Sequence, residues 1–269
     1  MTTNGFSHGI VAMFDVLGYV NFLENNHGNE AVATVLDTIL DKKDGISEIM
    51  RSMIQGNSEI VKTVVDGIKW LVFSDTILLT CACDERDAPN IKAAKWAGVI
   101  YASVILMRDM FEYGLPLRGA IATGEYMVRE TCFAGRPIVE AYLLSQDLDV
   151  AACVMTPDAY RQAHDVSTHP GEMKNLSLHL PAMFFEYPVP LKDGRIKELQ
   201  TLNILGIGPD WFRKFVEGDI GQIVRSSFEG HGKTVLPQCE RKVKNTEQLI
   251  QYSMNLIKPF WEAQTKQQS

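Results

Sequence analysis

The apolar run at residues 10–14 (Ile-Val-Ala-Met-Phe) is the feature that most constrains the fold. Five consecutive apolar side chains are typical of a short strand that is buried on both faces of a sheet. The run stops at Asp15, and Val16, Leu17 and Gly18 follow it. The pattern therefore predicts a central strand that carries a carboxylate at its end.

A second interrupted run predicts a hairpin. Residues 60–65 and 68–73 are rich in β-branched and aromatic side chains, so both stretches are expected to be strands. Ser74 and Asp75 then break the apolar pattern before residues 76–80 resume it. We expect Asp75 to lie at the tip of the hairpin.

The remaining pattern alternates helices with strands. Residues 19–54 have mixed helical periodicity, through Val32, Val35, Leu36, Ile39 and Leu40, and predict one long helix or a broken pair. Further helices are expected at 89–112 and 137–146 and after Thr156, and further strands at 115–128 and 151–155. This order predicts an α+β fold with a ferredoxin-like split β-α-β sheet and helices on one face.

The character of the chain changes near residue 165. Residues 1–165 are expected to form the catalytic core, and residues 166–269 a C-terminal extension packed on it. In the extension, residues 183–187 and 199–205 favour strands, and an amphipathic helix capped by Asn245 ends the chain.

Composition narrows the choice of partners. The net charge of −7 argues against binding a nucleic-acid duplex, which needs a basic surface. Five cysteines without Cys-x-x-Cys spacing indicate neither a disulfide framework nor a zinc site, and they fit a cytoplasmic location. No apolar stretch reaches the ~20 residues that a membrane span needs.

The two aspartates are the strongest candidates for chemistry. If the strand end and the hairpin tip lie on neighbouring strands, Asp15 and Asp75 are side by side, and their charges repel unless cations lie between them. Carboxylate oxygens suit Mg²⁺ or Mn²⁺, and the backbone carbonyl of Val16 could add a ligand. Asp15 alone could equally be a turn or cap residue, but Asp75 within an apolar run favours metal binding.

Gly18 and Tyr19 follow the first aspartate. A glycine turn that enters a helix presents unpaired N–H groups, which favour a phosphate chain. Metals and turn together would hold a nucleoside triphosphate so that its ribose 3′-hydroxyl attacks the α-phosphorus and releases pyrophosphate.

Four motifs in order resemble class III nucleotidyl cyclases over about residues 8 to 156. They are Phe14-Asp15-Val16-Leu17-Gly18-Tyr19, Phe73-Ser74-Asp75-Thr76, Leu117-Arg118-Gly119-Ala120-Ile121-Ala122-Thr123-Gly124 and Gly135-Arg136-Pro137-Ile138-Val139-Glu140-Ala141. The resemblance implies that Asp15 and Asp75 are catalytic. It also implies that Asp15, Val16 and Asp75 hold two divalent ions, Mn²⁺ or Mg²⁺. Phe14, Gly18, Tyr19 and Arg118 are the substrate-binding residues that it implies.

The departures from that family concern base recognition. Leu71 and Cys132 stand where purine cyclases have Lys and Asp, and Val139 and Leu143 stand where they have Asn and Arg. The pattern is similar to the bacterial pyrimidine cyclases of anti-phage defence. That likeness implies a homodimer with sites at the interface, which makes cyclic UMP from UTP for a separate effector protein.

Alternatives stay open at this stage. The chain could be a cytidylate cyclase, or a degenerate cyclase-like domain that binds a nucleotide without turning it over. A two-metal phosphohydrolase also fits an aspartate at a strand end, whereas an aspartate-nucleophile phosphatase would need a carboxylate at Leu17. A pure interaction module would not depend on Asp15 or Asp75.

Overall fold

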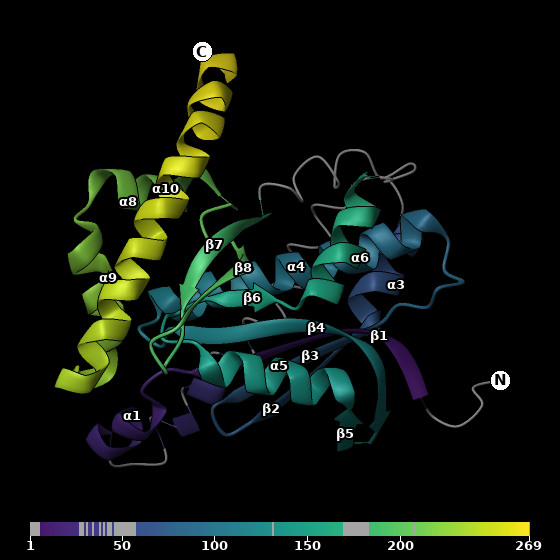
Figure 1. The fold of residues 1–269 in the computed structure, drawn as a ribbon, viewed down its shortest axis with the longest axis horizontal. Coiled ribbons are helices and arrows are strands. Elements are labelled where there is room, and N and C mark those ends of the chain that lie inside the picture. Colours follow the sequence, from purple (N-terminus) through teal and green to yellow (C-terminus); the bar gives the residue numbers. More distant parts are fainter. Residues whose placement is uncertain are drawn as a thin grey trace.

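A computed structural model describes residues 6–26, 58–130, 132–168, 183–206 and 208–268, and positions 30, 32–33, 35–37, 39, 41 and 45. Its strands form one eight-stranded sheet in the order β2-β3-β1-β4-β6-β8-β7, with β5 paired to β4 (Figure 1). The strands are β1 (Phe6–Val16), β2 (Ile68–Phe73), β3 (Thr76–Ala82), β4 (Leu117–Arg129), β5 (Cys132–Gly135), β6 (Cys153–Met155), β7 (Phe184–Pro190) and β8 (Ile196–Leu202). The helices are α1 (Tyr19–Asn25), α3 (Ser58–Gly67), α4 (Pro89–Glu112), α5 (Arg136–Asp147), α6 (Pro157–Thr168), α8 (Pro209–Glu217), α9 (Ile220–Glu229) and α10 (Glu240–Gln268), with short 3-10 turns η2 (Gly230–Gly232) and η3 (Pro237–Cys239).

Strand β1 is the central strand that its sequence predicts. It pairs antiparallel with β3 on one side and with β4 on the other, and Ile10, Val11 and Ala12 are fully buried. Both registers meet at Asp15, which lies opposite Thr76 of β3 and Arg118 of β4. The predicted α+β class and the alternating order of elements are confirmed.

Helix α4 fills the core on one face of the sheet. It is apolar nearly all round, and a helix of that kind is stable only when it is covered on every side. Phe14 of β1 and Ile121 of β4 pack in the same cluster as Trp96 and Ile100 of α4. The predicted helix at 89–112 is therefore confirmed with both of its ends.

Helix α5 corrects the expectation that the helices lie on one face. Its Ala141 packs against Ala120 and Ala122 of β4, which point away from the α4 side because side chains alternate along a strand. Small alanine side chains allow α5 to approach the sheet closely. The side of the sheet that carries Asp15 and Arg118 is thus partly covered by α5 (Figure 1).

The C-terminal elements join both the sheet and the core. Strand β8 pairs with β6 at Val154 and Thr201, and Val243, Ile250 and Met254 of α10 belong to the same hydrophobic cluster as α4. Figure 1 shows α8, α9 and α10 grouped beside the end of the sheet near α1. The domain division at residue 165 stays a prediction.

Three expectations from the sequence are wrong or incomplete. Residues 60–65 lie in helix α3 and not in a strand, because packing on α4 outweighs the β propensity of the valines. The tail helix begins at Glu240, so Asn245 is not its cap. Of the expected helix at 19–54, α1 ends at Asn25, single positions from 30 to 45 are helical, and the rest lies outside the described residues.

Within the part of the chain that the structure describes, no helix is long and apolar enough to cross a membrane.

Candidate active site

The end of β1 and the tip of the β2–β3 hairpin are joined by a backbone hydrogen bond. The N–H of Val16 donates to the carbonyl oxygen of Asp75 at 3.0 Å. The two-residue turn is tight, and Ser74 adopts a left-handed backbone conformation with φ of 55°. The structure therefore brings Asp15, Val16 and Asp75 together as the sequence predicts, with both aspartates half-buried.

Arg118 is fixed beside Asp15. Its Nε and Nη2 atoms lie 2.8 and 2.7 Å from Oδ2 of Asp15, and the exposed fractions of the two side chains are 9% and 15%. The guanidinium also donates to Oε1 of Gln146 at 2.6 Å and to the Gln146 carbonyl at 3.3 Å. Gln146 lies in the last turn of α5, so helix and strand together orient Arg118.

Gly119 explains how β4 comes so close to β1. A Cβ atom at this position would lie 2.4 Å from Cδ1 of Phe14 and 2.7 Å from the carbonyl oxygen of Met13. Those separations are well below van der Waals contact, so any side chain here would push the strands apart. The glycine in the Leu-Arg-Gly motif thus holds Arg118 within reach of Asp15.

Asp75 differs from Asp15 in having no fixed partner. Its carboxylate forms no hydrogen bond or ion pair with any residue that the structure describes, although it is half-buried. Its charge is felt by Tyr19, whose pKa is raised by burial and further by the negative charge of Asp75. A half-buried carboxylate next to another carboxylate is stabilised by a cation.

The turn at Leu17 and Gly18 leads from the site into α1. Leu17 N–H donates to the Pro116 carbonyl at 2.9 Å, and Gly18 is exposed with φ of 76°, a conformation that favours glycine. Tyr19 is buried and stacks on Phe22 at 5.8 Å. Gly18 thus lies next to the aspartates. Tyr19 is mainly a packing residue, and the nearby charge of Asp75 helps to raise its pKa.

The side chain of Phe14 does not point toward the site. It is fully buried on the α4 face, whereas Asp15 faces the opposite side because neighbouring residues of a strand alternate. The expected contact between the Phe14 ring and a nucleotide is therefore not supported by the structure.

Two lysines that the sequence analysis does not single out lie near the site. Lys192 is in the turn between β7 and β8, and Lys242 is in the first turn of α10. Burial lowers the pKa of each amino group, and the positive charge of Arg118 lowers it further, while Asp15 acts in the opposite direction on both. The sequence contains no local signal for either lysine, because only the tertiary fold brings the β7–β8 turn and the start of α10 together against the segment before β6.

The donor set suits a hard divalent cation. Among the described residues, no group of three or more His, Cys, Asp or Glu side chains is placed to hold a metal ion. Mg²⁺ does not require such a group, because it commonly uses one or two carboxylates and completes its shell with water and substrate phosphates. The unpaired carboxylate of Asp75, together with Asp15 and the Val16 carbonyl, fits that mode of binding.

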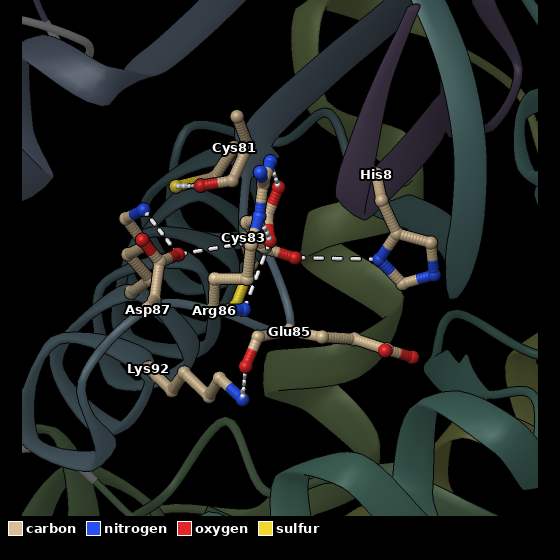
Figure 2. Close-up of polar contacts among 10 residues, drawn as sticks. His8, Cys81, Cys83, Glu85, Arg86, Asp87 and Lys92 are labelled. Carbon is tan, nitrogen blue, oxygen red and sulfur yellow. Dashed lines mark hydrogen bonds and ion pairs between the residues drawn. The ribbon is translucent and has the colours of Figure 1, made fainter.

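A second polar cluster lies at the other end of β1 and β3 (Figure 2). There His8 Nδ1 lies 3.3 Å from the Cys83 carbonyl, Lys95 pairs with Asp87 at 2.7 Å, and Arg86 pairs with Asp84 at 2.9 Å. Burial raises the pKa of the Cys83 thiol to about 11, so it stays protonated near neutral pH. These groups satisfy one another, and the cluster offers no reactive side chain.

The residues that depart from the purine-cyclase pattern lie on three elements, β2, β5 and α5. Leu71 lines a cavity of about 620 Å³ with Trp70, Phe133 and Thr80. Cys132 is exposed. Val139 and Leu143 project from α5 with exposed fractions of 55% and 57%.

Comparison with known proteins gives a similarity of fold. No family model and no curated protein matches the chain. The adenylyl cyclase CyaB from P. aeruginosa is 14% identical, with a TM-score of 0.43, over 73% of this chain and 94% of that one. A class III adenylyl cyclase-like ATP-binding protein from Pseudomonas aeruginosa is 12% identical, with a TM-score of 0.42, over 65% of this chain and 43% of that one.

A third solved structure, the guanylyl cyclase Cya2, is 11% identical, with a TM-score of 0.35, over 76% of this chain and 94% of that one. Because these identities and TM-scores are low, we base the function on the residues of this chain.

Proposed function

We propose that the chain is a metal-dependent nucleotidyl cyclase that converts UTP to 3′,5′-cyclic UMP and pyrophosphate. The observation that carries the proposal is the pair of half-buried carboxylates, Asp15 and Asp75, of which Asp75 has no counter-charge among the described residues. A divalent cation is the partner that such a pair requires.

Asp15, Asp75 and the Val16 carbonyl would hold two Mg²⁺ or Mn²⁺ ions. Bound there, the ions would lower the pKa of the ribose 3′-hydroxyl and offset the charge of the leaving pyrophosphate. Both aspartates are catalytic residues in this proposal. Their positions are fixed by the β1–β3 register and by the hydrogen bond from Val16 to Asp75.

Arg118 and the Gly18 turn would bind the phosphates. Gln146 and Asp15 hold the guanidinium in one orientation, so little side-chain entropy remains to be lost when a phosphate oxygen binds. Gly18 is exposed next to the aspartates and allows close approach of a phosphate chain to the backbone. Tyr19 supports the turn through its stacking on Phe22.

The preference for a pyrimidine rests on what the chain lacks. Leu71 and Cys132 offer neither the cation nor the carboxylate that purine cyclases place at these positions, although Lys69 and Glu130 line the cavity beside Leu71 together with its aromatic and aliphatic side chains. The choice of uracil over cytosine as the substrate base follows from the resemblance to the pyrimidine cyclases of anti-phage defence. A cytidylate cyclase and a catalytically inactive nucleotide-binding domain are the alternatives.

The same resemblance supports a homodimer with its sites at the interface, and a product that acts on a separate effector in anti-phage defence. Large apolar side chains are exposed near the site, as an interface requires. They are Phe73, Val139, Tyr142 and Leu143.

The experiment is a product assay. Purified protein is incubated with each of the four common nucleoside triphosphates and Mn²⁺, and cyclic monophosphate and pyrophosphate are measured by mass spectrometry and a coupled assay. We expect cyclic UMP as the main product. Cyclic CMP would favour the first alternative, inorganic phosphate would indicate a phosphohydrolase, and the absence of any product would refute the cyclase.

Asp15→Asn and Asp75→Asn test the two catalytic residues. Because each removes a ligand charge, we expect at least about a 100-fold loss of product, more than the loss of a supporting metal-site residue usually causes. Asp158→Asn is the matched control, since Asp158 is exposed on α6 and its ion pair with Arg161 is exposed as well. Circular dichroism checks that all three variants are folded, and full activity of Asp75→Asn would exclude the proposed role.

A further inference from the structure

The start of α10 is attached to the segment that leads from α5 to β6. Asn245 Nδ2 donates to the Asp149 carbonyl at 2.8 Å, and the Thr246 hydroxyl accepts from Ala151 N–H at 2.9 Å. Arg241 forms an ion pair with the Asp149 carboxylate. These contacts hold the first turns of α10 against the strand junction next to β4.

That attachment also includes the turn that carries Lys192. Arg241 Nη2 donates to the Lys192 carbonyl at 3.1 Å, while Lys192 N–H donates to the Asp147 carbonyl at 2.9 Å. Since Gly119 N–H binds the Ala152 carbonyl at 2.8 Å, the segment at 147–152 runs directly beside Arg118. The start of α10, the turn at Lys192 and the segment at 147–152 therefore meet next to the stretch of β4 that carries Arg118.

Lys242, in the first turn of α10, brings a further positive charge to the region around Arg118. It is half-buried, and its amino group makes no hydrogen bond or ion pair with any described residue. Thr246, one helical turn after Lys242, is buried and accepts the Ala151 N–H, so Lys242 lies on the face of α10 that packs on the segment before β6. Lys242 thus belongs to the surroundings of the catalytic aspartates.

Among the described residues, no acidic side chain forms an ion pair with this amino group. Asp149 is occupied by Arg241, Asp147 is exposed, and Asp15 is already paired with Arg118. Keeping Arg118, Lys192 and Lys242 close together costs free energy through like-charge repulsion. A bound anion with several charges would remove that cost, and a triphosphate is such an anion.

We propose that Lys242 binds the polyphosphate of the nucleotide, so that α10 of the C-terminal extension supplies part of the active site. The proposal rests on the proposed function for the identity of the nucleotide. Its chemistry is an ammonium group donating to phosphate oxygens beside the Arg118 guanidinium. The extension is then required for substrate binding and not only for folding.

Titration calorimetry with inorganic triphosphate tests the proposal on the full chain. Loss of one charge-assisted hydrogen bond is worth about 1.5–3 kcal/mol, so Lys242→Met should weaken triphosphate binding by about 10-fold or more. Lys242→Arg keeps the charge and should stay within about threefold of the unmodified chain. Lys244→Met, an exposed lysine on the same helix, is the matched control and should bind normally.

Uridine, which has no phosphate, separates binding from folding. Lys242→Met should bind uridine as the unmodified chain does, because the lysine contacts only phosphates. Equal triphosphate affinity in Lys242→Met and the unmodified chain, or an equal loss for uridine and triphosphate, would overturn the role of Lys242. Lack of triphosphate binding by the unmodified chain would overturn it as well.

The proposed function fails in a different way. A chain that binds triphosphate through Lys242 but forms no cyclic product from any nucleoside triphosphate would refute the cyclase and leave the phosphate-binding role of Lys242 in place.

Discussion

Asp15 and Asp75 are neighbours with different electrostatic surroundings. Asp15 is neutralised by Arg118 from the adjacent strand, whereas Asp75 depends on whatever cation enters the site. Arg118 itself is buried and has no other acidic partner among the described residues. The stability of the site without metal therefore depends on one ion pair.

Arg118→Met tests how much the Arg118–Asp15 ion pair contributes to stability. Removing one partner of a buried ion pair typically costs about 3–5 kcal/mol, and here it leaves the Asp15 carboxylate beside Asp75 without its ion-pair partner. We expect a comparable loss in the free energy of unfolding, measured by urea denaturation without divalent ions. Added Mn²⁺ should then stabilise the variant more than the unmodified chain, because binding to the folded state alone raises stability.

Arg161→Met is the control, since its pair with Asp158 is exposed and should contribute under about 1 kcal/mol. An equal effect of Mn²⁺ on Arg118→Met and on the unmodified chain would contradict a metal site at Asp15.

At the scale of elements, local pattern predicts the elements whose burial is encoded in their own sequence. The run at 10–14 predicts β1, the apolar stretch from Pro89 predicts α4, and the break at Asp75 predicts the hairpin tip. Together they predict that Asp15 and Asp75 are adjacent. Helix α3 is missed because its valines favour strand, and only its contact with α4 decides the outcome.

The contacts of the extension with the site could not be predicted, because they join residues far apart in the chain. The loop after α9 holds α1 in this way: Asn26 Nδ2 donates to the His231 carbonyl at 2.8 Å, and Thr234 N–H donates to Asn21 Oδ1 at 2.8 Å. Between them, the buried amino group of Lys233 donates to the Gly114 carbonyl at 2.7 Å and its stem lies against Gly18.

Lys233 should make stability depend on alkaline pH. Burial lowers its pKa to about 8 from 10.5, so between these values the unfolded chain binds a proton that the folded chain has lost. The free energy of unfolding contributed by Lys233 therefore rises as pH increases from about 8 to 10.5, and this gain is lost as pH falls through 8. Lys233→Met should lack the rise, by about 3 kcal/mol at most.

Urea denaturation of both proteins across this pH range measures the effect, since other titrating groups are common to both. Lys244→Met, which changes an exposed lysine, should follow the unmodified chain. A pH-independent difference between Lys233→Met and the unmodified chain would show that Lys233 is not buried as a titrating group.

For the whole molecule, three of the exposed apolar side chains lie on elements that also contribute to the site. Phe73 is 74% exposed at the end of β2 that leads to Asp75, and Val139 and Leu143 lie on α5, whose last turn holds Arg118 through Gln146. Water contact with such side chains is unfavourable, so a second copy of the chain would gain free energy by covering them. Because they lie near the site, that copy would also close it. Substrate turnover should then require the dimer.

Val139→Lys combined with Leu143→Lys should dissociate that dimer. Burying each apolar side chain contributes about 1.5–3 kcal/mol, so replacing both by lysine should weaken association by more than about 100-fold. Analytical ultracentrifugation measures the association, and specific activity at increasing protein concentration shows whether product formation follows the dimer. Val216→Lys is the matched control, because Val216 has a similar exposed fraction of 50% and lies on α8, outside the sheet. A monomeric variant with full activity would contradict the interface, because its site would be complete within one chain.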